Sequence, residues 1–362
     1  MKRDPFKEYI TQTEPNKRDK GYAWQTAIGL QAVDGLSPSE YLIATAINNI
    51  EGRIDIDEAQ QLLDQYYREN PIAQENDRTE EADKVSARIA KMLSENAFSF
   101  TPNYYMAIHK DLFRGIYKHA GQIRTYNITK KEWVLDGSTV LYGPASELRA
   151  ALEYDLSQEK SFSYKGLSMD ETIRHLAVFV SRLWQIHVFA EGNTRTTAVF
   201  FIKYLRTLGF DVTNDIFAED AWYFRNALVR ANYNDLKNGI HETTEFLELF
   251  LRNLLLGEKN ELHNRTMHIS GAFQSVDKEK DIGVNGNEGN VGINVGIKSK
   301  KQPLQEKILL LLNEDGSLSA RALSEMLEVS QRQVERCIAE LKKSDRIERV
   351  GAKRNGTWIV LS

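Results

Sequence analysis

The segment 170–186 is the feature that most restricts how this chain folds. It reads Asp-Glu-Thr-Ile-Arg-His-Leu-Ala-Val-Phe-Val-Ser-Arg-Leu-Trp-Gln-Ile, and as a helix it carries apolar side chains nearly all round. A helix on a protein surface needs only one apolar stripe, so a helix of this kind lies among other helices. The sequence therefore predicts a helical bundle with this segment in its middle.

Helical patterns occupy most of residues 37–257. The apolar spacing and the cap signals predict helices at about 39–50, from Ile56 through Tyr67, at about 80–95 and at about 103–118. Residues 129–142 break this pattern and read as two short strands with Asp136-Gly137 at the turn. The expected fold of residues 1–257 is therefore mainly α, with a small β-hairpin flap at 129–142.

Composition limits the class of protein. A chain of 362 residues is long enough for two domains, and its net charge of −4 argues against a protein that binds nucleic acid with its whole surface. Cys337 is the only cysteine, which excludes an intrachain disulfide and a cysteine-based metal cluster. No apolar run approaches the roughly 18 residues of a membrane span, and the amino terminus does not resemble a signal peptide. A cytoplasmic protein without membrane contact is expected.

The chain changes character after residue 257. Residues 258–302 contain a Gly- and Asn-rich run and are interpreted as a flexible linker, with a short strand that docks onto a partner as the alternative. Residues 303–362 show a compact pattern: helices at 304–312, 319–327 and 331–343, then strands at 347–351 and 357–361. This order is typical of a winged helix-turn-helix.

Residues 187–198, here called the signature loop, carry the chemistry. They read His-Val-Phe-Ala-Glu-Gly-Asn-Thr-Arg-Thr-Thr-Ala and lead directly into a helical pattern. His187 can accept a proton near neutral pH, and Glu191 can hold a hard cation such as Mg²⁺. Gly192 lets the backbone approach a phosphate, and Arg195 can grip phosphate oxygens. These are the parts of a phosphate-transfer site.

The loop resembles the signature of Fic (filamentation induced by cAMP) domain proteins, His-Pro-Phe-x-(Asp/Glu)-Gly-Asn-Gly-Arg-x-x-Arg. Of the nine specified positions the chain keeps six: His187, Phe189, Glu191, Gly192, Asn193 and Arg195. It departs from the pattern at Val188, Thr194 and Ala198. The segment 108–124 is also similar to the stretch before the flap in this family.

The resemblance implies a nucleotidyltransferase that moves AMP from ATP onto a Ser, Thr or Tyr hydroxyl of a protein, including this chain itself. His187 would be the general base, and Glu191 would hold Mg²⁺ or Mn²⁺. Nucleotide contacts would come from Gly192, Asn193, Thr194, Arg195 and, in the adenosine pocket, Asn232. The target would dock on the flap by strand addition, at Thr129, Val140, Leu141 and Tyr142.

Two departures bear on the nucleotide. Thr194 is disfavoured if its position needs a positive φ but comfortable in the first turn of a helix, which is the interpretation preferred here. Ala198 removes the arginine that binds the γ-phosphate in the family, a charged hydrogen bond of roughly 1.5–3 kcal/mol. A cation from elsewhere, such as Arg124 or Arg230, could replace it, or another nucleotide could be used. The transferred group is therefore open.

Glu51 ends the helix that begins near Ser39, in a segment similar to the inhibitory motif of many Fic proteins. There the glutamate pairs with the second signature arginine, which is Ala198 in this chain. An inhibitory Glu51 would have to meet Arg195, the loop amides or water, because a buried carboxylate without a partner is costly. The alternatives are a plain helix-end residue, or a carboxylate that positions water for removal of AMP from a modified protein.

The C-terminal unit predicts a second activity. Arg332, Gln333 and Arg336 lie on the expected recognition helix and Lys353 and Arg354 on the wing, where they could contact DNA. Residues 298–362 hold thirteen Lys and Arg against nine Asp and Glu, a net charge of +4. A DNA-binding regulator is one interpretation of residues 303–362, and a module for protein contact or homodimer formation is the other.

Overall fold

A computed structural model describes residues 5–11, 14–72, 77–212 and 216–270 of the chain. Of the C-terminal part it describes residues 305, 308–309, 311–312, 318–327, 329, 331–343, 346–350 and 357–360. The chain separates into two compact units, residues 1–283 and 284–362. Each unit is described by itself.

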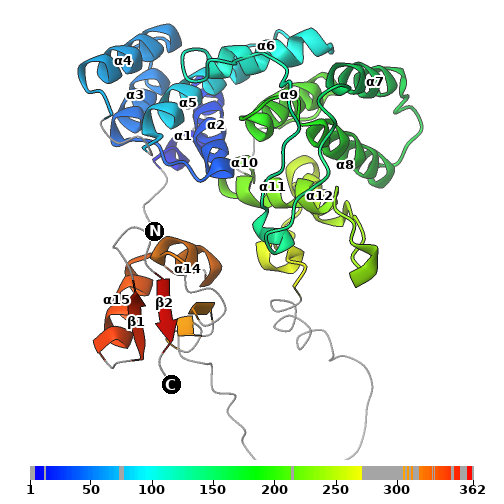
Figure 1. The fold of residues 1–362 in the computed structure, drawn as a ribbon. Coiled ribbons are helices and arrows are strands. Elements are labelled where there is room, and N and C mark those ends of the chain that lie inside the picture. Colours follow the sequence, from blue (N-terminus) through cyan, green and yellow to red (C-terminus); the bar gives the residue numbers. More distant parts are fainter. Residues whose placement is uncertain are drawn as a thin grey trace, which may run out of the picture. The chain divides into compact units, whose positions relative to one another are not determined.

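The first unit begins with a layer of helices around α2 and α5 (Figure 1). In order these are α1 (Lys7–Ile10), α2 (Pro15–Gly29), the 3-10 helix η1 (Leu30–Asp34), α3 (Glu40–Ile50), α4 (Ile56–Glu69), α5 (Thr79–Ser94) and α6 (Pro102–Phe113). Ser39 caps α3 by accepting a hydrogen bond from Leu42 N, and Asp55 and Glu58 form a capping box that starts α4. The four helices expected in this part are confirmed, except that α6 ends at Phe113 and not near 118. Helix α2 was not predicted, because its first half is charged.

The second group of helices surrounds α9. It comprises α7 (Leu148–Ser161), α8 (Met169–Ile186), α9 (Asn193–Thr207), α10 (Ile216–Glu219), α11 (Ala221–Arg230), η3 (Leu236–Asn238), α12 (Glu245–Leu256) and η4 (Asn264–Met267). The predicted bundle is confirmed, but its most buried helix is α9, in which residues 193–205 are all buried. Helix α8 leaves Arg174 and Arg182 exposed, so the helix after the signature loop, and not the one before it, is the centre.

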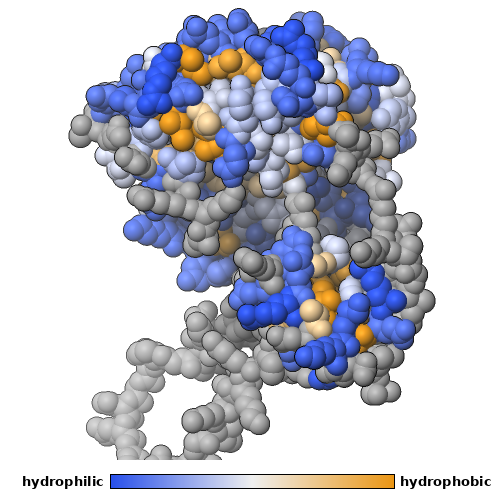
Figure 2. Space-filling model, turned by 90° about the vertical axis from the view of Figure 1, so that its left-hand side faces the viewer, coloured by the Kyte–Doolittle hydropathy of each residue, from blue (hydrophilic) through white to orange (hydrophobic). Residues whose placement is uncertain are grey.

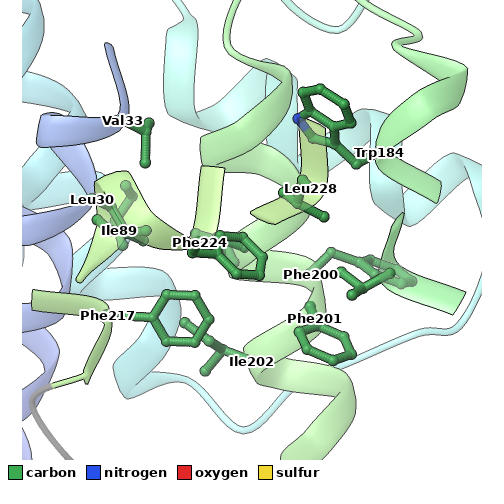
Figure 3. Close-up of a cluster of buried hydrophobic side chains, with 14 of the residues drawn as sticks. Leu30, Val33, Ile89, Trp184, Phe200, Phe201, Ile202, Phe217, Phe224 and Leu228 are labelled. Carbon is green, nitrogen blue, oxygen red and sulfur yellow. The ribbon is translucent and has the colours of Figure 1, made fainter. Parts of the chain in front are cut away.

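One hydrophobic core connects the two groups of helices. Leu30 and Val33 of η1 and Ile89 of α5 belong to the same buried cluster as Phe200 and Phe224 (Figure 3). Further along the chain, Phe217 packs against Phe224 and Phe250, with ring centroids 5.1 and 5.0 Å apart. Continuous burial of this kind fixes α9, and therefore the signature loop at its start, against the N-terminal helices.

The flap differs from the predicted hairpin. The turn at Asp136-Gly137 is present, with φ of 52° and 80°, and Glu132 N donates to Ser138 O at 2.9 Å across it. Between these points the chain forms a 3-10 helix, η2 (Trp133–Leu135), and residues 129–142 contain no strand. The strand prediction is therefore wrong, because Val134 and Leu135 turn into the core in place of alternating across a sheet.

The start of the predicted linker belongs to the first unit. Asn260 N donates to Asn253 Oδ1 at 2.8 Å, and Ile269 N donates to Val134 O at 3.0 Å. Met267 is buried in the main core. Residues 258–270 are thus packed, which corrects the prediction for this part, and residues 271–302 lie outside the described part of the chain.

On the face shown in Figure 2, hydrophobic residues of the first unit lie in separate patches among hydrophilic ones.

The second unit has the predicted order of elements. The described residues between 305 and 312 are helical and precede α14 (Ala320–Leu327) and α15 (Gln331–Lys343). Strands β1 (Ile347–Val350) and β2 (Thr357–Val360) pair antiparallel, with Ile347 opposite Val360. Val334, Ile338 and Leu341 of α15 share a separate core with Ile347 and Trp358. This is the fold of a small winged helix-turn-helix.

Candidate active site

His187 lies at the point where α8 ends, in the left-handed conformation with φ 52° and ψ 58°. This conformation is uncommon for a residue other than glycine and needs support from its surroundings. Arg124 supplies it: the guanidinium donates to the carbonyl oxygens of His187 at 2.7 Å, Gly143 at 2.5 Å and Tyr126 at 2.6 Å. Arg124 is itself buried. The backbone that presents the imidazole is therefore held by a residue 63 positions earlier in the sequence.

The imidazole of His187 is buried and neutral. Its Nδ1 lies 3.4 Å from Trp184 O, and its Nε2 has no hydrogen-bond partner among the described residues. Burial lowers the pKa of His187 well below its usual value, and the charge of nearby Lys130 lowers it further. A proton on Nδ1 that is directed to Trp184 O leaves a lone pair on Nε2. This is the form of histidine that a general base requires.

Tyr142 of the flap covers this imidazole. The two ring centroids are 4.2 Å apart, and the Tyr142 hydroxyl donates to Glu132 Oε1 at 3.0 Å. Glu132, which is buried, also accepts two hydrogen bonds from Arg225, at 2.6 and 3.1 Å. Of the predicted docking residues, Val140 and Tyr142 are buried, whereas Thr129 is exposed and Leu141 is 85% exposed. Only Thr129 and Leu141 are therefore placed to touch another protein in this arrangement.

Glu191 is half exposed and pairs with Lys130, whose Nζ lies 3.1 Å from Glu191 Oε2. No group of three or more His, Cys, Asp or Glu side chains capable of holding a metal occurs in the described ranges. In nucleotide sites, however, Mg²⁺ commonly takes one or two carboxylates and completes its shell with phosphate oxygens and water. The single accessible carboxylate of Glu191 fits that donor set.

Gly192 and the two residues after it shape the start of α9. Gly192 has φ 76°, and a Cβ there would lie 2.4 Å from the Phe113 ring, so only glycine fits. The Asn193 side chain closes the loop by accepting from Phe189 N and donating to Phe189 O. Thr194 stands in the first turn of α9, as preferred from the sequence, and its hydroxyl accepts from Trp184 Nε1 at 3.0 Å. The side chains of Asn193 and Thr194 thus hold the loop, and its backbone amides are what remains for an anion.

The Arg195 side chain points to the N-terminal helices. It is fully buried, and its Nη2 lies 2.6 Å from Glu81 Oε1 and 2.8 Å from Asp34 Oδ2. Its Nη1 donates to Gln31 Oε1 at 2.9 Å, and the Tyr117 hydroxyl is 3.4 Å from Nη2. In this arrangement the guanidinium is occupied by carboxylates of the N-terminal helices, and a contact of Arg195 with phosphate stays a prediction.

Glu81 is the partner that the sequence analysis missed. Burial alone would raise its pKa, but two hydrogen bonds from Arg78 and the charge of Arg195 bring the pKa down to about 2. Glu81 is therefore ionised at neutral pH and forms a buried, hydrogen-bonded ion cluster with two arginines. Its position on the buried side of α5 could be read from the sequence, but its partner could not.

Glu51 is not joined to the signature loop by any contact of the described residues. It is paired with Lys17 at 3.3 Å, and hydrogen bonds from Tyr9 and Lys17 lower its pKa. In this arrangement Lys17 of α2 offers Glu51 a cation, whereas Ala198 offers none and is itself buried in the core. An inhibitory role of Glu51 stays a prediction.

The remaining predicted contacts are also accounted for. Asn232 Nδ2 donates to Ser181 O at 3.0 Å and to Leu228 O at 2.9 Å, so in this arrangement it ties α11 to α8. Arg124 is committed to backbone carbonyls, as described above. Arg230 is buried and donates to His241 O at 3.3 Å, and its Nε and Nη1 have no partner in the described part of the chain. Neither arginine is shown to replace the missing cation at Ala198.

A second buried histidine, His109, holds the backbone of the signature loop in place. His109 accepts a hydrogen bond from Gly121 N at 2.8 Å on Nδ1, which leaves Nε2–H to donate to Glu191 O at 3.0 Å. Its ring stacks on Phe189 with centroids 3.7 Å apart. Burial lowers the pKa of His109 to about 3. His109 thus stays neutral and positions the backbone of the metal-binding candidate.

These buried imidazoles predict a loss of stability in mild acid. Above about pH 6.5 both histidines are neutral in the folded and the unfolded chain. Below it the unfolded chain binds protons that the folded chain excludes, so the free energy of unfolding falls by at most about 1.4 kcal/mol per pH unit for each group. For His109 this continues down to its folded pKa of about 3.

Urea unfolding between about pH 7 and pH 5 checks this, because a carboxylate with an ordinary pKa titrates below that window. The His109→Gln variant is expected to show a shallower dependence on pH. The exposed His241, changed to Gln, should leave the slope as it is. Equal slopes in all three proteins would contradict the assignment of a buried, neutral His109.

In the second unit, α15 carries the residues predicted to contact DNA. Gln333 and Arg336 are exposed on this helix. Arg332 lies on the same helix, and its side chain is outside the described part. Lys353 and Arg354 also lie outside the described residues. The cation–π contacts of Lys342 and Arg349 with Trp358 place two positive charges beside the sheet.

The fold and the loop together give a helical protein with a buried histidine at the end of α8 and a glycine turn that opens α9 beside it. Residues 99–205 match the family model described as Fic/DOC family. Residues 302–348 match the model described as winged helix-turn-helix DNA-binding. The chain therefore contains a region, residues 99–205, that matches the Fic/DOC family and a C-terminal region that matches a winged helix-turn-helix, as the sequence predicts. In the described residues no helix is long and apolar enough to cross a membrane.

Two solved structures are similar to the chain. One is the N-terminal FIC domain of Bep8, a VirB-translocated effector protein of Bartonella sp. 1-1C, at 19% identity over 47% of this chain and 81% of that one, with a TM-score of 0.37. The other is a Fic family protein of Desulfovibrio desulfuricans G20, at 14% identity over 98% of this chain and 92% of that one, with a TM-score of 0.41. No curated protein gave a significant match.

Proposed function

We propose that this protein is a Fic-type nucleotidyltransferase that moves AMP from ATP onto a Ser, Thr or Tyr hydroxyl of a protein, itself included. The observation that carries the proposal is the buried His187 with an unpartnered Nε2, four residues before a half-exposed Glu191 that is followed by an anion-binding helix start. The match of residues 99–205 to the Fic/DOC family supports a transferase of this type.

The parts perform the transfer as follows. The target hydroxyl oxygen bonds to the α-phosphorus as the bond from that phosphorus to the bridging oxygen breaks, and pyrophosphate leaves. The hydroxyl proton passes to His187 Nε2. Glu191 would hold Mg²⁺ or Mn²⁺, which when bound neutralises phosphate charge. The amides of Asn193 and Thr194, at the positive end of α9, stabilise the negative charge that develops on the α-phosphate oxygens.

A nucleotide panel tests the proposal. The protein is incubated separately with ATP, GTP, CTP and UTP in the presence of Mg²⁺ or Mn²⁺, and the mass of the intact chain is measured. We expect the mass of one added AMP or more with ATP, and none after chelation of the metal. Addition of a different nucleotide would correct the substrate, and no addition with any of them by a folded protein would contradict a transferase.

A second function is favoured by the winged helix-turn-helix. We propose that residues 303–362 bind duplex DNA through α15, because the match to a DNA-binding family covers 302–348 and the Gln333 and Arg336 side chains are exposed on this helix. DNA binding would allow the chain to act as a regulator of transcription. It does not exclude a transferase activity in the first unit.

Gel retardation of random-sequence duplex DNA by the full chain, measured at several salt concentrations, tests DNA binding. Arg336→Ala is expected to weaken binding and to lower the slope of log K against log salt by about 1, as loss of one phosphate contact does. Glu335→Ala, which changes the exposed neighbour, should not weaken it. No retardation, together with a concentration-dependent dimer in sedimentation, would assign the unit to protein contact.

A further inference from the structure

Of the positive side chains around His187, one is partly accessible and can change its partner. Three positive side chains lower the pKa of His187 through their charge: Lys130, Arg225 and Arg124. Arg124 is buried and bonded to carbonyl oxygens, and Arg225 is held by the buried Glu132. Lys130 differs from both, because its side chain is 26% exposed and it forms its ion pair with the half-exposed Glu191.

The signature loop itself supplies no accessible cation for the phosphates. Arg195, the arginine that the loop carries, is locked by Glu81 and Asp34 in the interior. Ala198 is a buried apolar residue. A nucleoside triphosphate brings about four negative charges to the site, and a divalent ion balances two of them. The remaining charge therefore needs a flexible, accessible cation close to Glu191.

We propose that Lys130 binds the phosphates that depart with pyrophosphate and is the residue that makes the site selective for a nucleoside triphosphate over a monophosphate. This inference rests on the proposed function. In the described structure Lys130 holds the Glu191 carboxylate, with Nζ and Oε2 3.1 Å apart. An accessible ion pair of this kind contributes roughly 0–1 kcal/mol, so it gives way when Glu191 takes a divalent ion.

The geometry supports this exchange. Lys130 lies in the flap directly after Thr129, so its ammonium reaches Glu191 of the signature loop from the flap and not from α9. The lysine side chain is a flexible chain of four carbons that ends in an ammonium group with three N–H donors. The ammonium can therefore move from one anionic oxygen to another nearby. In the proposed transfer the charge that appears on the bridging oxygen leaves with the pyrophosphate, and the ammonium released from Glu191 would balance that charge.

Calorimetric titration with ATP and with AMP, both in the presence of Mg²⁺, tests the proposal. Lys130→Gln is expected to raise the Kd of ATP by about tenfold or more, the effect of losing one charged hydrogen bond, and to change the Kd of AMP by less than about twofold. Lys130→Arg should keep most of the affinity for ATP. The matched control is Lys160→Gln, which removes the same charge from an exposed site on α7 and should leave both affinities unchanged.

The outcomes separate the two proposals. If wild-type protein binds and transfers AMP but Lys130→Gln binds ATP as wild type does, the role of Lys130 is wrong and the transferase stands. If Lys130→Gln weakens ATP and AMP equally, Lys130 only holds the loop in place and the proposed selectivity is wrong. If folded wild-type protein, checked by circular dichroism, binds neither nucleotide, both proposals fall.

Discussion

Replacing Glu81 by alanine is expected to lower the free energy of unfolding by about 3–5 kcal/mol, the cost of leaving a buried charge without its partner. The charge left behind is Arg195, which is completely buried and whose Nη2 lies 2.6 Å from Glu81 Oε1. Arg78 would lose two hydrogen bonds to the same carboxylate. A loss of this size is a large share of the stability of a typical domain.

The neighbouring Glu80 provides the control. It pairs with Lys84 at 2.8 Å, but its side chain is 37% exposed. Glu80→Ala removes the same charge from the same helix and is expected to cost less than about 1 kcal/mol. Urea unfolding of the two variants and the wild type compares the free energies directly. Equal small losses for Glu80→Ala and Glu81→Ala would show that the ion cluster around Arg195 does not hold α5 to α9.

Replacing Glu81 also separates a structural role of Arg195 from a role toward the nucleotide. If the cluster only holds the fold, Glu81→Gln keeps a hydrogen bond to Arg195 and retains transfer at temperatures where it is folded. If Arg195 is released toward the loop, Glu81→Gln transfers faster than wild type. The rate of self-labelling in the folded variant decides between them.

Changing His187 to alanine is expected to reduce AMP transfer by about 10²–10⁴-fold, the usual contribution of a general base. The reason is the unpartnered Nε2, which no other described side chain replaces. ATP affinity should change little, because the imidazole takes the proton of the target hydroxyl and does not bind the phosphates. Intact mass after incubation with ATP measures the transfer, and calorimetry measures the binding.

His241→Ala is the matched control, because this exposed histidine lies outside the site and only its carbonyl contacts Arg230. It should transfer at the wild-type rate. The low pKa of His187 adds a second expectation: the base stays unprotonated in mild acid, so wild-type transfer should persist below pH 6.5 as far as the protein remains folded. A folded His187→Ala protein that labels like wild type would remove His187 from the mechanism.

The parts of the site that are contiguous in sequence could be predicted without the structure. The loop 187–198, the left-handed Gly192 and the helical position of Thr194 all follow from neighbouring residues, because turn and cap geometry is decided within a few positions. The winged helix-turn-helix was predictable for the same reason. Its helices and hairpin alternate at regular, short intervals.

The flap and the inhibitory motif show where such reasoning fails. Residues 129–142 read as a hairpin, but Val134 and Leu135 are buried in the core, and Ile269, which follows η4, donates a hydrogen bond to Val134 O. Glu51 stands in a motif-like position, yet its partner is Lys17 of α2, a helix whose charged first half gave no signal. Tertiary packing overrode the local pattern in both places.

Local chemistry along the chain thus determined the class of fold, the candidate base, the candidate metal ligand and the glycine turn at the start of α9. Only the tertiary structure decided which charges are free to act. Arg195 and Glu81 lie 114 positions apart, and Arg124 and His187 lie 63 apart. A buried arginine must be matched by carboxylates or carbonyl oxygens, and which side chains supply them depends on how distant helices pack. That packing joins Arg195 to Glu81 and Arg124 to backbone carbonyl oxygens, and it leaves Lys130 beside Glu191.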